Sequence, residues 1–437
     1  MLKNKVNILV VGAGAVGLTL AAKLLKTKAV HVTLLENNIK RFSLLQQGNY
    51  IIDEPGMNEI FKKRLKQKRF IIKQQLQNNT FNCIFICIGT PRKKKSSDSE
   101  INFISLISEL SDKVEKKGFL LLRSTVPIGT TRKISKHLNE TGRSDINLLF
   151  APERTAEGVA LQELDVLPQI IGATNDLSLP KAEKFLSRIG FNVVKASSCE
   201  SAEFIKLISN SWRDASFALS NEIAIMAELL GLDSSEAISV ANYNYPRSNI
   251  PRPGPVGGPC LSKDSYILLE SFHNSFIEKS MIANARFINE QIEINAFNKI
   301  KDHLLKVGSK SSTLFLGAAF KGSPPTNDTR NGVTADLVKM LIEDGIDTQI
   351  SIWDPTISDQ DLFEFAHLKI DSVDEITPNV IIIGNNAKFL NKPNMRAFFS
   401  SLPRTTFVID LWGVTDSFNF STAEIYRLGL GTKTIYD

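Results

Sequence analysis

The sequence lacks the features that mark membrane, secreted and disulfide-stabilised proteins. No uncharged apolar run reaches the ~18 residues of a membrane-spanning helix, and residues 1–11 have neither the apolar core nor the small-residue cleavage site of a secretory signal. Only four cysteines occur in 437 residues, too few for a disulfide framework. This scarcity suits a reducing compartment, so we expect a cytoplasmic protein that does not contact a membrane.

Features of a nucleic-acid-binding protein are also missing. The net charge is +6, but the basic cluster Arg92–Lys95 has no interleaved aromatic residues and no recognised nucleic-acid-binding fold around it. We interpret the cluster as a solvated loop, and we predict neither a nucleic-acid partner nor a metal site. The positive balance fits an anionic ligand such as a nucleotide.

The first half of the chain alternates between strand-like and helix-like segments. A β-branched run at 6–11 is followed by a helical pattern at 15–25, and the alternation continues to about residue 195. Further strand-like runs are 30–35, 83–88, 119–122 and 146–150. Such alternation predicts a parallel sheet with helices on both faces.

The middle of the chain is helical, and the alternation returns after it. Residues 201–230 and about 263–305 have helical apolar spacing, and the loop 245–259 between them is rich in Pro and Gly. Later strand-like runs are 313–316, 349–353, 380–383 and 406–409. We predict an α/β protein with two Rossmann-like parallel-sheet domains joined by a long central helical domain. The predicted domains are 1–200, 201–307 and 308–437, with no close sequence repeat between the two ends.

A glycine pattern directly after the first strand predicts a dinucleotide site. Gly12, Gly14 and Gly17 fit G-x-G-x-x-G, which provides a tight turn, close backbone approach to a pyrophosphate and close helix–sheet packing. Ala15 and Val16 begin the helix, whose N-terminal N–H groups attract phosphate.

Residues at three later strand ends extend this site. Glu36 lies 19 residues after Gly17, where a carboxylate accepts from ribose hydroxyls and repels a 2′-phosphate. This favours NAD, although the nearby Arg41 keeps NADP as an alternative. The loops Gly89-Thr90-Pro91 and Ser124-Thr125-Val126-Pro127 should border the cofactor, or else they are simple proline turns.

A cysteine lies in a glycine-rich loop before a predicted helix. Cys260 follows Gly257, Gly258 and Pro259, and Lys263 comes three residues later. A loop cysteine by itself is more often an inert small hydrophobe. Beside a hydride acceptor, however, a thiol predicts oxidation of an aldehyde through a thiohemiacetal and a thioester to a carboxylate. The glycines allow close approach of a substrate, so we assign Gly257 to the substrate site.

The first predicted central helix carries polar residues at helical spacing. Lys206 and Asn210 are four residues apart and project from one face, which Arg213, Phe217 and Asn221 share. A cation and an amide donor suit a developing alkoxide, and we assign Arg213 and Asn221 to the substrate site. The alternative is a solvated stripe.

Several ordered motifs make the chain resemble one enzyme family. They are Gly12–Gly17, Ser124–Thr130, Ala151–Arg154, Glu203–Asn210, Gly257–Asp264, Phe320–Lys321 and Asp328–Arg330. The sequence resembles, over nearly its full length, the UDP-glucose/GDP-mannose dehydrogenase family of NAD-dependent nucleotide-sugar 6-dehydrogenases. The resemblance implies a four-electron oxidation of the sugar C6 alcohol to a carboxylate, with two NAD per turnover.

The resemblance also implies catalytic roles. Cys260 matches the family's nucleophile and Asp264 its acid–base partner, while Lys206 and Asn210 match the pair that stabilises oxyanions. Glu153 resembles the residue that activates the hydrolytic water and is also assigned to the substrate site.

Ligand contacts follow from the same resemblance. Thr125 and Glu157 would line the nicotinamide and the catalytic water, Arg330 would reach NAD, and Lys321 would contact the substrate. Further substrate contacts are assigned to Arg154, Arg247, Asn249 and Arg252. The long central helix forms a dimer interface in such families, so a homodimer is expected.

The sugar is indicated less sharply than the family. Ala151–Gly158 and Pro246–Ile250 look closer to the UDP-N-acetylhexosamine branch, whereas Cys260–Asp264 keeps a Lys-Asp pair typical of the UDP-glucose and GDP-mannose branches. We predict UDP-N-acetylmannosamine or UDP-N-acetylglucosamine, with UDP-glucose as the alternative, and a product used for surface polysaccharide. A two-electron hydroxyacid dehydrogenase would not need Cys260, and a catalytically silent nucleotide-sugar-binding protein would have lost Cys260 or Lys206.

Overall fold

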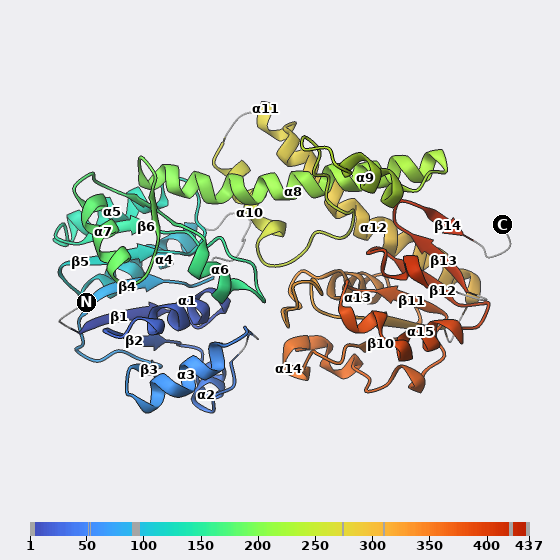
Figure 1. Cartoon of the computed structure of the whole chain (residues 1–437), viewed down its shortest axis with the longest axis horizontal. Helices are drawn as coiled ribbons and strands as arrows, with labels where there is room; N and C mark the ends of the chain where they lie inside the picture. The colour runs from blue at the N-terminus through green and yellow to red at the C-terminus, as the bar shows by residue number, and fades with distance from the viewer. Residues whose placement is uncertain are drawn as a thin grey trace. The chain divides into compact units, whose positions relative to one another are not determined.

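The computed structural model describes residues 5–50, 52, 54–89, 97–272, 275–308, 311–418 and 423–433. The chain forms two compact units, Met1–Ser209 (unit 1) and Asn210–Asp437 (unit 2) (Figure 1). Each unit contains one sheet with helices packed against it. Within the described ranges, no helix is both long and apolar enough to cross a membrane.

Unit 1 contains an eight-stranded sheet in the order β3-β2-β1-β4-β5-β6-β7-β8. Its strands are β1 (Val6–Val11), β2 (Val30–Leu35), β3 (Phe70–Lys73), β4 (Phe81–Ile86), β5 (Val114–Leu122), β6 (Asn147–Phe150), β7 (Gln169–Ala173) and β8 (Val193–Lys195). Neighbouring strands are parallel except β6 and β7. The first six strands have the order of dinucleotide-binding sheets, which reverses between β1 and β4.

Alternate residues of β1 supply two apolar cores on opposite faces of this sheet. Ile8 and Val10 belong to one core, and Leu9 and Val11 belong to the other. Helices on the first face are α1 (Ala15–Lys26), α2 (Ile39–Gln46), α3 (Met57–Lys66), α6 (Ala160–Val166) and α7 (Ser178–Arg188). The second face is covered by α4 (Ser97–Ser111), α5 (Thr130–Glu140) and the start of α8 (Cys199–Leu230). Because both faces are covered, the strand is apolar almost throughout.

Unit 2 contains a six-stranded sheet in the order β10-β9-β11-β12-β13-β14, parallel except for β14. Its strands are β9 (Ser311–Leu316), β10 (Thr348–Trp353), β11 (Val380–Ile383), β12 (Phe407–Asp410), β13 (Glu424–Arg427) and β14 (Gly431–Lys433). One face packs against α12 (Met281–Val307) and α13 (Val333–Glu343), and the other packs against α15 (Pro393–Ser400). A short α14 (Asp359–Leu362) follows β10. The two parallel-dominated sheets and the helical middle confirm the predicted fold class.

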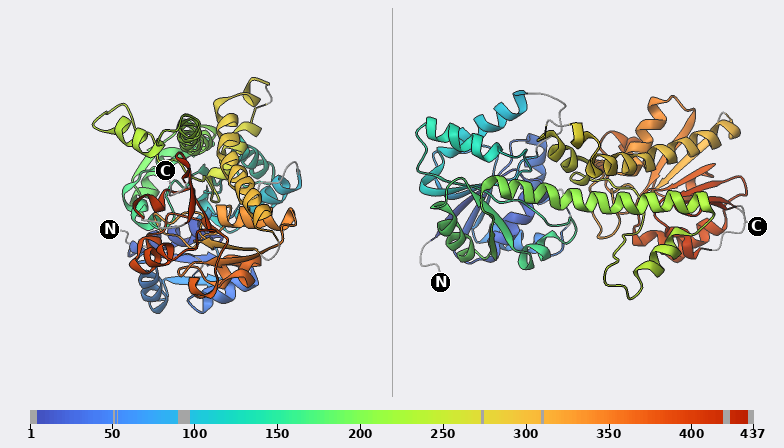
Figure 2. Two further views of the ribbon diagram at one scale, coloured as in Figure 1. Left: turned by 90° about the vertical axis from the view of Figure 1, so that its right-hand side faces the viewer. Right: turned by 90° about the horizontal axis from the view of Figure 1, so that it is seen from above.

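The helical middle agrees with the prediction in one half and differs in the other. The long helix expected at 201–230 is α8, which runs without interruption (Figure 2) and ends before Gly231 at φ +67°. The second stretch is divided into α10 (Leu261–Glu270), α11 (Ser275–Glu278) and α12, and α9 (Ser234–Asn242) precedes them. The break has a local cause, because the Ser280 hydroxyl caps α12 by accepting from the Ala283 N–H at 3.3 Å. The proposed division into three domains stays a prediction.

Candidate active site

The three glycines after β1 have different surroundings, and together these fit a dinucleotide. Gly12 has φ +95°, and a Cβ there would lie 2.8 Å from the Cys87 carbonyl oxygen. A Cβ on Gly17 would lie 1.9 Å from the Gly12 carbonyl oxygen, so α1 can approach the turn only without a side chain. Around Gly14 nothing lies within 4 Å of a Cβ position, which leaves open space at the N-cap of α1. The open backbone at a helix N-terminus suits a pyrophosphate.

Glu36 lies beside this turn. Its side chain is 4% exposed, and its Oε2 accepts from the Ala13 N–H at 3.1 Å. Arg41 Nη1 lies 3.4 Å from the same oxygen, and the Asn38 N–H donates to Oε1 at 2.9 Å. The carboxylate is therefore fixed next to the glycine turn, as the ribose-binding role requires.

Of the two later strand-end loops, the first is only partly described. Gly89 follows β4, whereas Thr90 and Pro91 lie outside the described residues, as does the basic cluster Arg92–Lys95. The Ser124 hydroxyl donates to the Ile88 carbonyl at 2.6 Å, which joins the ends of β5 and β4.

Buried Glu203 of α8 fixes the loop that contains Thr125. Glu203 accepts from the Gly129 and Thr131 N–H groups at 2.6 and 2.8 Å, at the start of α5. Sequence reasoning gave Glu203 no role of its own. The signal available in the sequence was an acidic residue one helical turn before Lys206, because carboxylates are favoured at helix N-termini.

Glu153, the predicted activator of water, lies in a buried polar cluster of unit 1. It pairs with Arg123, whose side chain is buried, and its Oε1 accepts from the Arg154 and Thr155 N–H groups at 2.8 and 2.9 Å. Burial alone would raise the pKa of Glu153, but Arg123 and the two N–H groups outweigh it and lower the pKa below its usual value. Glu153 is thus ionised at neutral pH, as a base must be.

Two neighbours of Glu153 were assigned to ligands. The Arg154 side chain donates to the Pro168 carbonyl at 2.7 Å, and Glu157 is partly buried. Their ligand contacts stay predictions.

Cys260 is the exposed cysteine of the chain, and the other three are buried. It is the N-cap residue of α10, and a helix N-terminus is a common position for a reactive cysteine. By contrast, burial raises the pKa of Cys83 well above its usual value and that of Cys87 and Cys199 to about 12. Cys260 is therefore the cysteine that combines exposure with a place at a helix N-terminus.

The loop before Cys260 packs tightly against another loop of unit 2. A Cβ on Gly257 would lie 2.0 Å from the Asn331 carbonyl oxygen, and Gly258 donates its N–H to the same oxygen at 2.8 Å. Gly258 has φ +87°, and a Cβ there would meet the Phe320 ring at 2.7 Å. The two glycines are therefore required by this packing as well as by any ligand.

Two predicted catalytic residues of unit 2 meet directly. The Asn210 amide donates to Asp264 Oδ2 at 2.6 Å, and Asp264 is fully buried in the first turn of α10. Lys206 lies one turn before Asn210 on α8 and is 6% exposed. The spacing that predicted a shared helix face thus corresponds to two mostly enclosed polar side chains.

The predicted substrate residues of unit 2 have varied surroundings. Arg252 pairs with Asp416, and Arg330 pairs with Asp328. Arg247 is exposed and lies over the Tyr245 ring, and Lys321 Nζ lies 5.5 Å from the Phe320 ring centroid. The side chains of Asn249 and Arg213 are also exposed. These residues keep their assignment only as a prediction.

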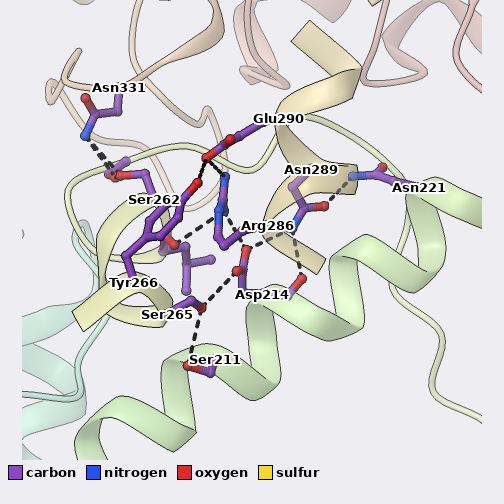
Figure 3. Close-up of polar contacts among 12 residues, drawn as sticks. Ser211, Asp214, Asn221, Ser262, Ser265, Tyr266, Arg286, Asn289, Glu290 and Asn331 are labelled. Carbon is purple, nitrogen blue, oxygen red and sulfur yellow. Dashed lines mark hydrogen bonds and ion pairs between the residues drawn. The ribbon is translucent and has the colours of Figure 1, made fainter. Parts of the chain in front are cut away.

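Asn221, another predicted substrate residue, is fully buried and hydrogen-bonded within unit 2. Its amide donates to the Gly254 carbonyl at 3.0 Å, and its Oδ1 accepts from the Gly254 N–H at 2.8 Å. It belongs to a buried polar network centred on Asp214 and Arg286, which sequence reasoning missed (Figure 3).

Known proteins resemble the chain in sequence and in structure. Residues 6–189 match the NAD binding domain of the UDP-glucose/GDP-mannose dehydrogenase family, and residues 200–291 match its central domain. A UDP-N-acetyl-D-mannosamine dehydrogenase of Methanococcus maripaludis is 29% identical over 403 residues, which cover 86% of this chain and 90% of the relative. A Campylobacter jejuni protein of the same name is 29% identical over 369 residues, covering 81% and 88%.

A solved structure agrees with these relatives. A UDP-D-ManNAc dehydrogenase from Pyrococcus horikoshii is similar with a TM-score of 0.84 and 26% identity, covering 97% of this chain and 99% of that one. These findings confirm the predicted family, the NAD cofactor and the enzyme class. The chain belongs to the UDP-glucose/GDP-mannose dehydrogenase family and is an NAD-dependent nucleotide-sugar dehydrogenase.

Proposed function

We propose that the protein oxidises C6 of UDP-N-acetylmannosamine to a carboxylate through a covalent bond to Cys260. The observation that carries the proposal is an exposed thiol at the N-terminus of α10 in a chain whose relatives are named UDP-N-acetyl-D-mannosamine dehydrogenases. UDP-N-acetylglucosamine and UDP-glucose are the competing substrates, because the Cys260–Asp264 segment keeps the Lys-Asp pair seen by resemblance in other branches.

The proposed reaction removes two hydrides from one carbon. NAD, when bound, would supply the hydride acceptor, and two NAD molecules would be consumed in succession for each sugar. After the first oxidation, the Cys260 sulfur adds to the C6 aldehyde and forms a thiohemiacetal. Loss of the second hydride gives a thioester, and water then cleaves it to release the carboxylate and restore the thiol.

Each of the predicted catalytic polar residues has a role in the proposed reaction. Asn210 is a donor whose amide is already oriented by Asp264, and Lys206 adds a positive charge one turn away, which suits the oxyanions of the alkoxide and tetrahedral stages. The buried Asp264 would exchange protons with the substrate. The ionised Glu153 would take a proton from the hydrolytic water, with Thr125 near the nicotinamide.

The stoichiometry of NADH tests the chemistry. A panel of UDP- and GDP-sugars should yield about two NADH per UDP-N-acetylmannosamine consumed, whereas a simple alcohol dehydrogenase would yield one and a silent binding protein none. Cys260→Ser should lower carboxylate formation by at least ~10³-fold, whereas the buried-cysteine control Cys199→Ser should leave it within a few-fold of the wild type. Carboxylate release by Cys260→Ser at the normal rate would disprove the covalent route.

A homodimer is part of the proposal. In unit 2, large apolar side chains are exposed along and just after α8, and such a concentration is unusual for a free surface. They are Trp212, Leu219, Met226, Leu229, Leu230 and Leu232. A second copy of the chain would cover them, as the family resemblance implies. Light scattering after size exclusion should show a dimer for the wild type and a monomer for Trp212→Glu/Leu229→Glu; a monomeric wild type would reject this part.

A further inference from the structure

An ion pair between α8 and α12 is almost completely buried in unit 2. Asp214 is 0% exposed and Arg286 is 3% exposed, and Arg286 Nη1 lies 2.6 Å from Asp214 Oδ1. Asn289 donates to the same oxygen at 2.8 Å, and the Ser265 hydroxyl donates to Oδ2 at 2.9 Å. We call Asp214, Arg286, Asn289 and Ser265 the Asp214 network (Figure 3).

The network is attached to the first turns of α10 at three points. Arg286 Nη1 approaches the Leu261 carbonyl at 3.4 Å, directly after Cys260. Ser265 is bound as described above. The Tyr266 hydroxyl donates to Glu290 at 2.7 Å, and Arg286 Nη2 lies 3.6 Å from that carboxylate. The three attached positions bracket Asp264, so the attachments restrict both the rotation and the translation of the helix that carries it.

The network also reaches the loop that leads to the nucleophile. Asn289 Oδ1 accepts from the Asn221 amide at 2.9 Å, and Asn221 exchanges two hydrogen bonds with Gly254. The segment from Gly254 to Ser265 is therefore held at both ends by the same buried cluster. Cys260 lies between these two anchors.

Stability alone gives a weak reason for this arrangement. A buried ion pair gains little over well-packed apolar side chains of similar volume, because both charges must leave water. A guanidinium, however, has donors in a fixed plane and can bond several oxygens in a defined geometry. Arg286 uses this property to join α8 and α10, the two helices that contribute Asn210 and Asp264.

We propose that the Asp214–Arg286 ion pair positions the nucleophile: it fixes the start of α10, and with it the Cys260 thiol and the Asp264 carboxylate, relative to Asn210. Neither Asp214 nor Arg286 touches the substrate in this proposal. The inference rests on the proposed function of Cys260, and it makes both residues positioning residues.

Four variants separate positioning from stability. Asp214→Asn and Arg286→Met each leave a buried partner unmatched, so both should lower Tm and kcat. The double variant Asp214→Leu/Arg286→Met removes both charges and should regain most of the lost Tm. Its kcat should nevertheless stay about 10- to 100-fold below the wild type, with KM changed less than about threefold, because the misplaced groups act on the chemical steps. Arg286→Lys should recover only part of the activity.

A second readout does not need turnover. Iodoacetamide reacts with thiolates, and Cys260 is the exposed cysteine, so its alkylation rate across pH reports the setting of the sulfur. The double variant should change this rate at pH 7 by about threefold or more. Tyr426→Phe is the control, because it removes a partly buried hydrogen bond to Glu228 on the same α8 and should leave both kcat and alkylation unchanged.

Two outcomes would overturn the proposal. One is a double variant with wild-type kcat and a wild-type alkylation profile, which would leave the pair a purely structural feature. If that variant does not fold, Ser265→Ala takes its place, and wild-type values for this variant would overturn the proposal equally. Failure of the covalent function is distinguishable, because it would appear as carboxylate formation by Cys260→Ser, while alkylation would still measure the position of the thiol.

Discussion

The turn after the first strand has the same form in both units, but the segments that follow the turn differ. In unit 1, Gly12 has φ +95° and donates its N–H to the Leu35 carbonyl at 2.9 Å. In unit 2, Gly317 has φ +92° and donates to the Trp353 carbonyl at 2.9 Å. Each turn thus bonds to the end of the strand that comes second in its unit.

An acid completes both turns. Glu36 accepts from the Ala13 N–H at 3.1 Å, and Asp354 accepts from the Ala318 N–H at 2.9 Å. Asp354 also accepts from the Thr356 N–H and hydroxyl at 2.9 and 2.7 Å, which ties it to its own loop. We interpret this hydrogen bond between turn and acid as a structural feature of both units, and we expect only the turn in unit 1 to bind NAD.

The difference lies in what comes next. In unit 1 the helix begins at once, at Ala15, and presents its N-terminus at the turn. In unit 2 residues 318–332 intervene before α13, and this segment holds Lys321, Arg330 and Asn331. A helix end recognises phosphate through its backbone, whereas an inserted loop provides side chains that can vary with the ligand.

The largest expected effects come from replacing the glycine that packs against the turn carbonyl in each unit. A Cβ on Gly17 would lie 1.9 Å from the Gly12 carbonyl oxygen, and a Cβ on Gly384 would lie 2.1 Å from the Gly317 carbonyl oxygen. Either alanine substitution should lower the free energy of unfolding by about 1–3 kcal/mol. Only Gly17→Ala should also weaken NAD binding about 10- to 100-fold, measured by calorimetry.

Gly14→Ala is the control for these two variants. Because the space around Gly14 is open, its Tm should stay at the wild-type value even if NAD binds less tightly. An equal loss of NAD affinity in Gly384→Ala would refute the assignment of the cofactor to unit 1.

The two acids provide a test of intermediate size. Glu36→Gln should weaken NAD binding about tenfold, because a charged acceptor for the ribose is lost. Asp354→Asn should leave NAD binding unchanged and lower the free energy of unfolding by about 1–2 kcal/mol. Titrations with NAD and urea unfolding of both variants measure these effects. A loss of NAD affinity in Asp354→Asn but not in Glu36→Gln would contradict the assignment of the ribose-binding acid to Glu36.

The smallest expected effect concerns pH, with opposite signs in the two units. Burial, and then Asp336, raises the pKa of Glu293 in unit 2 to about 8, so the folded state keeps a proton that the unfolded chain loses above about 4.5. Stability therefore falls as pH rises from about 4.5 to about 8. Glu293→Gln should raise Tm by about 2–4 °C at pH 8.5 and leave it unchanged at pH 4.

The counterpart in unit 1 behaves in the reverse sense. The hydrogen bond from Arg132 lowers the pKa of Glu200 to about 2, so its contribution is complete above about 4.5 and is lost as pH falls toward 2. Glu200→Gln should lower Tm slightly at pH 7 and converge with the wild type near pH 2. Scanning calorimetry across pH checks both variants. A Tm difference between variant and wild type that does not change with pH would contradict the pKa shift of that glutamate.

Local spacing was sufficient to predict the first two strands of unit 1 and the acid beside its glycine turn. The runs 6–11 and 30–35 coincide with β1 and β2, and the distance from Gly17 to Glu36 correctly placed an acid at the turn. Five strands were not predicted: β3, β7, β8, β13 and β14. Of these, β8 and β14 have only three residues each and too little pattern to stand out.

The buried network was beyond the reach of a single sequence. Counted from Asn210 at ~100° per residue, Arg213 and Asp214 fall on opposite sides of the same stripe, so spacing alone could not choose between them. The structure buries Asp214 and leaves Arg213 exposed. The partner Arg286 is 72 residues away, and only the tertiary fold brings it to Asp214.

Asn331 has consequences for protein engineering. It adopts a left-handed φ of +49°, and its carbonyl is in close contact with Gly257 and Gly258, while its amide donates to Ser262 at 3.0 Å. Grafting the 318–332 insertion from a relative with another sugar preference would thus strain the backbone that carries the thiol. A working chimera should exchange residues 254–262 in the same transplant, as one cassette.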